Sequence, residues 1–297
     1  MNREQFNYTL LLGGVRLRFR SEIPLEITDA DRPFLDETDS ADASADIFFR
    51  NSQIVLPRGE CGHDLLMRYK RDEKYFYASG RKEAVGDCCT IRYTPDFSEI
   101  SCYVNERQYP RMIRKIGKVL QLFPIRQFLI RYQAAILHSS RIKICGKAIL
   151  FTAPSQTGKT TQARLWNKYE NAELLSNDRT IIRQSGGKFM TYGYPVDGSS
   201  PAYCNEEAPL GAVVILKQGP ENRIERMRMP RALKLLMEQT VSDVWNCEEL
   251  TEIQSLWLEL MELYPVYQLT CRPDREAVQC LKERLVKDGV IIYGDDD

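Results

Sequence analysis

Alternating apolar and polar positions dominate the first 110 residues and predict short β-strands. Tyr8–Arg20 alternates on both sides of Gly13-Gly14, a pair typical of a hairpin turn. Asp29–Asp46 is acidic and rich in Ser and Ala, which predicts a solvated loop. Further strands are expected at Ala45–Phe49, Leu65–Lys70, Lys74–Ala78, Cys88–Tyr93 and Ile100–Val104. Residues 1–110 are therefore expected to form a small antiparallel β-unit.

Between Arg111 and Gln133 the apolar spacing becomes helical. Apolar residues recur three or four positions apart and are interrupted by Pro124, which cannot continue a helix. Basic residues lie between them, a combination that suits a membrane surface or an acidic partner. A surface helix packed on the next domain explains the same pattern more simply. Residues 111–135 are assigned as a helical linker at the start of a second domain, 111–297.

The second domain mixes buried strands with amphipathic helices. Strands are expected at Ala148–Thr152, Leu210–Lys217 and Val266–Cys271, and helices at Gln162–Tyr169, Pro230–Val241, Glu248–Leu263 and Asp274–Lys287. The alternation predicts an α/β (α+β) domain with a mixed sheet and C-terminal helices.

Composition narrows the function classes. The chain has 297 residues, and 41 Lys and Arg balance 41 Asp and Glu, so no surplus of positive charge favours nucleic-acid binding. No apolar run approaches the roughly 20 residues that cross a bilayer, and the polar start (Met1–Gln5) is unlike a signal peptide. A cytoplasmic protein with neither nucleic-acid binding nor membrane insertion is expected.

Cysteine and histidine give no metal or disulfide pattern. The nine cysteines contain no CxxC pair, which predicts reduced thiols rather than zinc ligands. His63 and His138 are the two histidines, too few for a His-rich metal site.

The segment after Ala148–Thr152 carries the strongest chemical signal. Ala153–Thr161 matches the P-loop pattern G-x-x-x-x-G-K-[ST], with Ala153 in place of the first Gly. An expected strand precedes it and an expected helix follows it, in the order that the motif requires. Ala is tolerated at position 153 if its φ is negative.

Each position of this loop has a chemical reason. Backbone N–H groups at a helix start converge on phosphate oxygens, and Gly158 allows a close approach. The Lys159 ammonium neutralises the β- and γ-phosphates, and the Thr160 hydroxyl is a Mg²⁺ ligand in such loops. The expected nucleotide-binding residues are Ser155, Gln156, Thr157, Gly158, Lys159, Thr160 and Thr161. ATP, or another nucleoside triphosphate, with Mg²⁺ is the expected cofactor.

A second strand, opened by Leu174-Leu175, ends at Asn177-Asp178. One short helix after the loop, Asp178 is placed to hold Mg²⁺ directly or through water. A turn aspartate between two strands explains the same residue without a function.

At this point the chain resembles a known family. Leu137-His138, Ala148–Thr152, Ser155–Thr161 and Leu174–Arg179 together resemble the catalytic domain of HPr kinase/phosphorylase, which shares its P-loop core with phosphoenolpyruvate carboxykinases. The likeness is closer still to HPr-kinase-like proteins encoded beside peptide-modification enzymes, such as lasso-peptide kinases, and it covers about residues 130 to 290.

The resemblance implies ATP-dependent phosphate transfer to a serine-type hydroxyl of a small protein or peptide. It implies that His138 lies near the phosphate site, with Lys159 and Thr160 in the loop and Asp178 on the metal. His138, Lys159 and Asp178 are thus the expected catalytic residues. The sequence is also compatible with a homo-oligomer.

Two departures from the family pattern leave alternatives. The family has two adjacent aspartates, the first credited as the general base, where this chain has Asn177-Asp178, and an amide cannot take the proton. Either His138 or Asp197 acts as base, or transfer proceeds without strong base assistance, or catalysis is lost. The second departure is Ala153-Pro154 with Gln156, in a loop usually richer in glycine.

Two more segments carry weaker signals. Thr191–Ser200 is rich in turn residues and either lines the acceptor side or is a plain turn. The arginines within Arg223–Arg231 either reach the γ-phosphate or an acidic acceptor, or lie on a solvated face, which the interleaved Glu221 and Glu225 favour. The alternative to a kinase is a nucleotide-binding accessory protein of a peptide-modification pathway with weak or no transferase activity.

Overall fold

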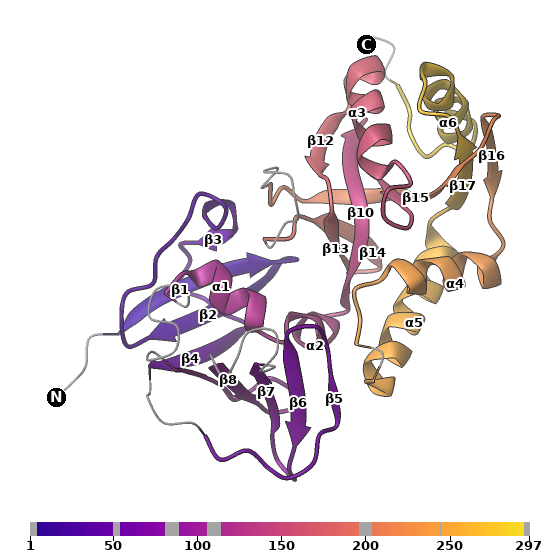
Figure 1. The fold of residues 1–297 in the computed structure, drawn as a ribbon. Coiled ribbons are helices and arrows are strands. Elements are labelled where there is room, and N and C mark those ends of the chain that lie inside the picture. Colours follow the sequence, from indigo (N-terminus) through magenta and orange to yellow (C-terminus); the bar gives the residue numbers. More distant parts are fainter. Residues whose placement is uncertain are drawn as a thin grey trace. The chain divides into compact units, whose positions relative to one another are not determined.

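The structure, a computed structural model, describes residues 5–49, 54–80, 89–105, 114–195, 204–243 and 245–293. The chain folds into two compact units (Figure 1). The first unit comprises Met1–Tyr132 and Asp243–Glu249, and the second comprises Gln133–Ser242 and Leu250–Asp297. The division differs from the expected one near residue 110, because the helical segment 114–132 belongs to the first unit.

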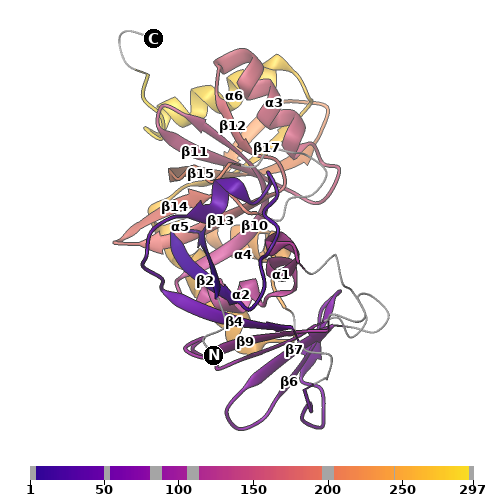
Figure 2. The ribbon, with the colours of Figure 1, turned by 90° about the vertical axis from the view of Figure 1, so that its left-hand side faces the viewer.

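The first unit contains a nine-stranded sheet in the order β3-β1-β2-β4-β9-β8-β7-β6-β5. In Figure 2 the labelled strands β2, β4, β9, β7 and β6 follow one another across it. Its strands are β1 (Phe6–Leu12), β2 (Val15–Ser21), β3 (Leu35–Asp36), β4 (Ala43–Phe49), β5 (Gly62–His63), β6 (Met67–Arg71), β7 (Phe76–Gly80), β8 (Cys89–Tyr93) and β9 (Ile100–Val104).

The expectation of a purely antiparallel unit is wrong at the centre of this sheet. β4 pairs in parallel with β2 on one side and with β9 on the other, so the sheet is mixed. The expected loop Asp29–Asp46 holds a short 3-10 helix (Arg32–Phe34), β3 and the start of β4. That connection reverses the chain before it enters β4. Side-chain alternation sets which face of a strand is buried but not the direction of the strand.

One face of the first sheet is covered by α1 (Ile116–Leu122) and α2 (Ile125–Ile130), which Pro124 separates as the sequence predicts. Phe123 and Phe128 each contact Phe97 edge-on or tilted, with ring centroids 6.2 and 5.5 Å apart. Phe123 also lies 5.8 Å from the ring of Phe19 on β2. These aromatic contacts explain why the helices belong to the first unit.

The segment Asp243–Glu249 enters the first unit from far along the chain. The Asp243 carboxylate accepts a charged hydrogen bond from Arg126 Nη2 at 2.7 Å, and the same nitrogen lies 2.5 Å from Asp64 Oδ2. Trp245 packs tilted against Tyr69, with ring centroids 4.8 Å apart. Burial raises the pKa of Asp243, and the Arg126 charge opposes that effect. No short-range sequence signal marks this attachment.

The second unit contains an eight-stranded mixed sheet. The path is β11-β10-β13-β14-β15-β17-β16, with β12 on β10 and an added β11–β15 pairing. Its strands are β10 (Ala134–Ile144), β11 (Lys147–Thr152), β12 (Glu173–Ser176), β13 (Arg179–Ser185), β14 (Lys188–Tyr192), β15 (Ala208–Gln218), β16 (Arg223–Arg226) and β17 (Val266–Cys271). β15 pairs in parallel with both β11 and β17.

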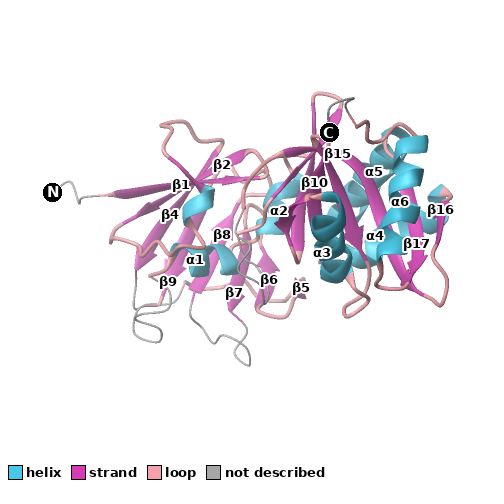
Figure 3. Cartoon of the chain, turned by 90° about the horizontal axis from the view of Figure 1, so that it is seen from above, coloured by secondary structure: helices cyan, strands magenta, loops and turns pink. Residues whose placement is uncertain are grey.

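The helices of the second unit are α3 (Lys159–Glu170), α4 (Met229–Gln239), α6 (Arg275–Lys287) and most of α5 (Cys247–Leu263); all helices are cyan in Figure 3. α3 and α6 lie side by side (Figure 1) over a core that includes Trp166, Phe151 and Leu281. The mixed sheets and helices agree with the expected α+β class. Within the described residues, no helix is both long and apolar enough to cross a membrane.

The arginine-rich segment takes a structure that the sequence does not indicate. Arg223–Arg226 is β16, an edge strand antiparallel to β17. Arg223 and Arg231 both contact the Glu225 carboxylate, at 2.9 and 3.4 Å. This matches the solvated face that the interleaved glutamates favour.

Candidate nucleotide-binding site

The candidate phosphate loop, Ala153–Thr161, joins β11 to the start of α3. Ala153 is fully buried in the core, and among the described residues it is not one with positive φ, so Ala meets the condition for replacing Gly. Gln156 and Gly158 have φ of +64° and +112°, and these left-handed residues turn the chain into the helix.

The first turn of α3 leaves backbone donors for a ligand. Gly158 is the N-cap, and no side chain caps the helix. The first N–H groups of any helix have no carbonyl partner within it, so those of Lys159, Thr160 and Thr161 suit an anion. A Cβ at Gly158 would meet no atom within 4 Å, so space is open beside the turn.

The Lys159 side chain folds back over the loop. Its Nζ donates to the carbonyl oxygens of Ala153 at 2.7 Å and Pro154 at 3.3 Å. Burial lowers the pKa of the Lys159 ammonium, and the nearby Asp178 carboxylate opposes this effect. Because the Lys159 ammonium is half-buried and lies at the positive end of α3, it is placed to bind an anionic group of a ligand in addition to Asp178.

The turn between β12 and β13 brings Asn177 and Asp178 beside the helix start. The carbonyl of Asn177 accepts from Ser140 Oγ at 3.0 Å and lies 3.5 Å from Thr160 Oγ1. Ser139 N–H donates to the Asp178 carbonyl at 3.0 Å. β10 therefore holds this turn in place through its own backbone and side chains. The Asn177 side chain is buried, with 8% of the residue exposed.

His138 and Arg179 flank the Asp178 carboxylate. His138 Nδ1 lies 3.7 Å from Asp178 Oδ1, and Arg179 Nε lies 3.6 Å from Oδ2. The interaction with His138 lowers the pKa of Asp178, as do the Arg179 and Lys159 charges, against the raising effect of burial. The carboxylate is thus kept ionised and half-exposed, as a hard-cation ligand needs to be.

Register explains why His138 and Asp178 meet. β10 pairs antiparallel with β13, and His138 lies opposite Arg179. Thr152 at the end of β11 donates its hydroxyl to the His138 carbonyl at 2.7 Å. The middle of β10 and the turn between β12 and β13 therefore bring His138 and Asp178 to the edge of the sheet where β11 ends and α3 begins at Lys159.

Gln218 is a further residue of this edge. It ends β15, and its Nε2 lies 3.4 Å from the Gln156 carbonyl and 3.5 Å from that of Thr157. The signal that could have indicated Gln218 as a site residue is its position at the carboxyl end of a strand parallel to β11, because ligands of open α/β sheets bind at such ends.

Part of the expected site is outside the described residues. This applies to Asp197, the second base candidate, and to Gly198, Ser199 and Ser200. Among the residues that the structure describes, no group of three or more His, Cys, Asp or Glu side chains is placed to hold a metal ion.

The Gly158 conformation predicts a binding defect without unfolding. In Gly158→Ala, a Cβ at φ +112° strains the backbone by about 1–3 kcal/mol, which displaces the N–H groups at the helix start. We expect Mg²⁺-ATP affinity to fall about tenfold in calorimetric titration. Gly187→Ala, in the β13–β14 turn at φ +75°, carries similar strain away from the loop and should bind normally. Equal affinity of both variants would contradict the prediction.

Comparison with solved structures gives distant likenesses, of which one follows. No family model matches the chain, and no curated protein does. The Hpr(Ser) kinase/phosphatase from Coxiella burnetii aligns with 52% of this chain and 95% of its own, at 12% identity and a TM-score of 0.29.

Proposed function

We propose that the second unit binds a nucleoside triphosphate at Ala153–Thr161 and transfers its γ-phosphate to a hydroxyl of a protein or peptide. The observation that carries the proposal is the convergence of Lys159, Thr160, Asp178 and His138 at one sheet edge, around the uncapped start of α3. Positioning and charge neutralisation are the main requirements of phosphoryl transfer, and these groups supply both.

The residues present fit a magnesium ion. The Thr160 hydroxyl and the ionised Asp178 carboxylate are the hard oxygen ligands that Mg²⁺ takes in small number, the phosphates and water completing its shell. When bound, the ion would neutralise negative charge on the phosphates. No three-residue cluster is needed for this role.

His138 is the proposed proton acceptor for the incoming hydroxyl. An imidazole gives and takes protons near neutral pH, which the Asn177 amide cannot do. Asp178 Oδ1 lies 3.7 Å from His138 Nδ1, so the imidazole stands beside the proposed metal ligand. Because the transition state of phosphoryl transfer is loose, a single imidazole is sufficient.

A second candidate function is a nucleotide-binding accessory protein with weak or no transferase activity. The observation that favours it is Asn177, a buried amide where the resembled family has a carboxylate. Binding through Lys159 and Thr160 would be unaffected by that replacement.

One experiment separates the two candidates. The protein is incubated with Mg²⁺, γ-labelled ATP and serine-containing peptides encoded by neighbouring genes. Label on a peptide serine that is lost in His138→Ala and Lys159→Ala supports the kinase. ATP binding that is lost in Lys159→Ala, without label transfer by the unmodified protein, supports the accessory role. Absence of binding of both ATP and GTP rejects both.

The metal assignment gives a direct prediction for Asp178→Asn. Removing the carboxylate charge should lower the enhancement of ATP binding by Mg²⁺ about tenfold, while metal-free ATP binding changes little or improves. Titrations with and without Mg²⁺ measure the ratio of the two ATP affinities. Glu173→Gln, at the start of β12 and before the turn, is the matched control. An unchanged ratio in Asp178→Asn would show that Asp178 holds no metal.

A further inference from the structure

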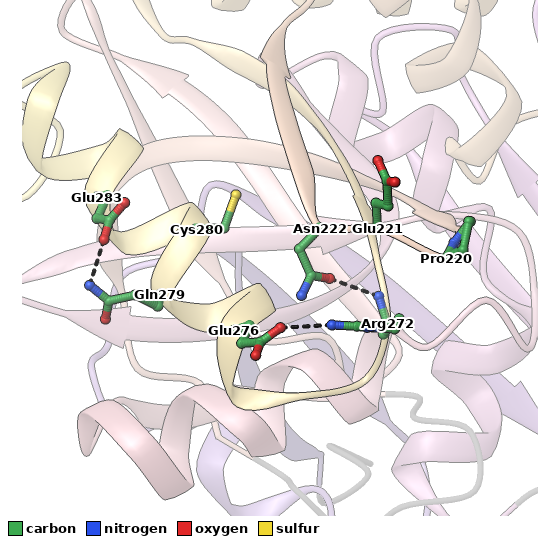
Figure 4. Close-up of a pocket in the computed structure, with 8 residues that line it drawn as sticks. All are labelled: Pro220, Glu221, Asn222, Arg272, Glu276, Gln279, Cys280 and Glu283. Atoms are coloured by element: carbon green, nitrogen blue, oxygen red, sulfur yellow. Dashed lines mark hydrogen bonds and ion pairs between the residues drawn. The ribbon is translucent and has the colours of Figure 1, made fainter.

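A cavity of about 420 Å³ lies between α6 and the loop that joins β15 to β16 (Figure 4). Glu221 and Asn222 line it from that loop, Arg272 lines it from the β17–α6 connection, and one face of α6 contributes Glu276, Gln279 and Glu283. Six of its eight lining residues are exposed, so it is an open depression on the surface, with a volume within the roughly 300–1,000 Å³ of small-ligand sites.

The cavity lies at the same edge of the sheet as Gln218, which contacts the candidate phosphate loop. β11, β15 and β17 are parallel neighbours, so their carboxyl ends lie at one edge of the sheet. Gln218 at the end of β15 contacts the carbonyls of Gln156 and Thr157. Pro220, which lines the cavity, is two residues further on, and two residues span at most about 7 Å.

Hydrogen bonds fix the cavity wall. Gly219 N–H donates to the Cys271 carbonyl at 3.2 Å, which ties the ends of β15 and β17 together. Asn222 Oδ1 accepts from Arg272 N–H, and its Nδ2 donates to Asp274 Oδ1, both at 2.9 Å. Asp274 in turn caps α6 by accepting from Ala277 N–H at 2.9 Å. The loop and the helix start are therefore preorganised.

The placement of the reacting groups sets the direction of a bound nucleotide. Asp178 and His138 lie on the β10 and β12 side of β11, whereas β15, β17 and the cavity lie on the other side. If the γ-phosphate faces Asp178 and His138, the nucleoside must leave the loop over β15 and β17. This step rests on the proposed function of Ala153–Thr161.

The charges of the cavity suit a nucleoside and not phosphate. The lining has three carboxylates, Glu221, Glu276 and Glu283, and one cation, Arg272. Arg272 Nη2 donates to Glu276 at 2.7 Å, and Gln279 Nε2 donates to Glu283 at 2.9 Å (Figure 4). The excess of carboxylates repels anions but accepts hydrogen bonds from amino and hydroxyl groups. Purine amino groups and ribose hydroxyls are such donors.

We propose that this cavity receives the nucleoside of the triphosphate bound at Ala153–Thr161 and selects bases that carry an exocyclic amino group. The cavity thereby determines which triphosphate is bound, and the phosphate loop provides the common anchor.

The test compares four probes on the full chain by calorimetry with Mg²⁺: ATP, GTP, ITP, which lacks the amino group, and inorganic tripolyphosphate. We expect ATP or GTP to bind about tenfold more tightly than tripolyphosphate and several-fold more tightly than ITP. Gln279→Trp places an indole in the cavity from an exposed position of α6. This substitution should abolish the preference for ATP or GTP over ITP and tripolyphosphate, while the affinity for tripolyphosphate stays the same. Lys287→Trp, exposed at the end of the same helix, is the control.

Each other outcome has a distinct meaning. If all four probes bind equally, or if the preference for nucleotides survives in Gln279→Trp, the cavity is not the nucleoside site although the phosphate site stands. If ITP matches ATP and GTP, selection by the amino group is rejected. If no probe binds, the proposed function of Ala153–Thr161 fails, and this inference with it.

Discussion

Replacing Lys159 with Ala should reduce Mg²⁺-ATP affinity at least about 30-fold, which equals about 2 kcal/mol. The ammonium is half-buried at the start of α3 and bonded to the Ala153 and Pro154 carbonyls, so it is held where phosphate charge would lie. Its removal leaves the phosphates in a partly desolvated site without the ammonium that would neutralise part of their charge. Calorimetric titration of the full chain measures the loss.

The control for Lys159→Ala is Lys168→Ala, on the same helix but exposed to solvent. It removes an equal charge and should change the affinity less than twofold, because exposed charges are screened. A thermal unfolding curve shows whether Lys159→Ala is folded. A folded Lys159→Ala that binds ATP as tightly as the unmodified protein would reject the phosphate site.

Replacing Trp166 with Ala should destabilise the second unit by about 3–5 kcal/mol. The side chain is fully buried between the sheet and α6, with its ring centroid 6.5 Å from that of Phe151. Truncation leaves a cavity behind the helix whose first turn forms the candidate phosphate loop. Urea denaturation followed by far-ultraviolet circular dichroism measures the change in the free energy of unfolding.

Trp166→Phe retains much of the buried area and should cost markedly less than Trp166→Ala. Bound ATP should raise the stability of both variants, because a ligand of the folded state shifts the unfolding equilibrium. A loss below about 1 kcal/mol in Trp166→Ala would show that the core under α3 relaxes to fill the space, contrary to close packing.

Local features of the fold can be predicted from sequence, whereas distant pairings cannot. Ile100–Val104 and Val266–Cys271 coincide with β9 and β17, because alternation or an apolar run is visible within five or six residues. The direction of β4 depends on how the chain returns through Arg32–Phe34 and β3, which no local pattern records. Likewise, the pairing of Asp243 with Arg126 joins positions far apart in the chain.

The candidate site divides in the same way. Gly158, Lys159 and Thr160 can be predicted because the motif is contiguous, and their placement at the start of α3 follows from that motif. The proximity of His138 to Asp178 depends on the β10–β13 register, and from sequence it rests on a resemblance alone. Gln218 escapes prediction, because a glutamine at the end of a strand has no distinctive spacing.

The attachment of Asp243–Glu249 to the first unit means that the polypeptide passes between the two units three times. A gene truncated after Tyr132 would encode the nine-stranded sheet without Asp243, so the Arg126 guanidinium would lose one of its two carboxylate partners. A fragment starting at Gln133 would carry Trp245 without the Tyr69 ring on which it packs. To express the first unit alone, the segment Asp243–Glu249 must be grafted onto it. To express the second unit alone, the gap that this segment leaves must be bridged by a short linker.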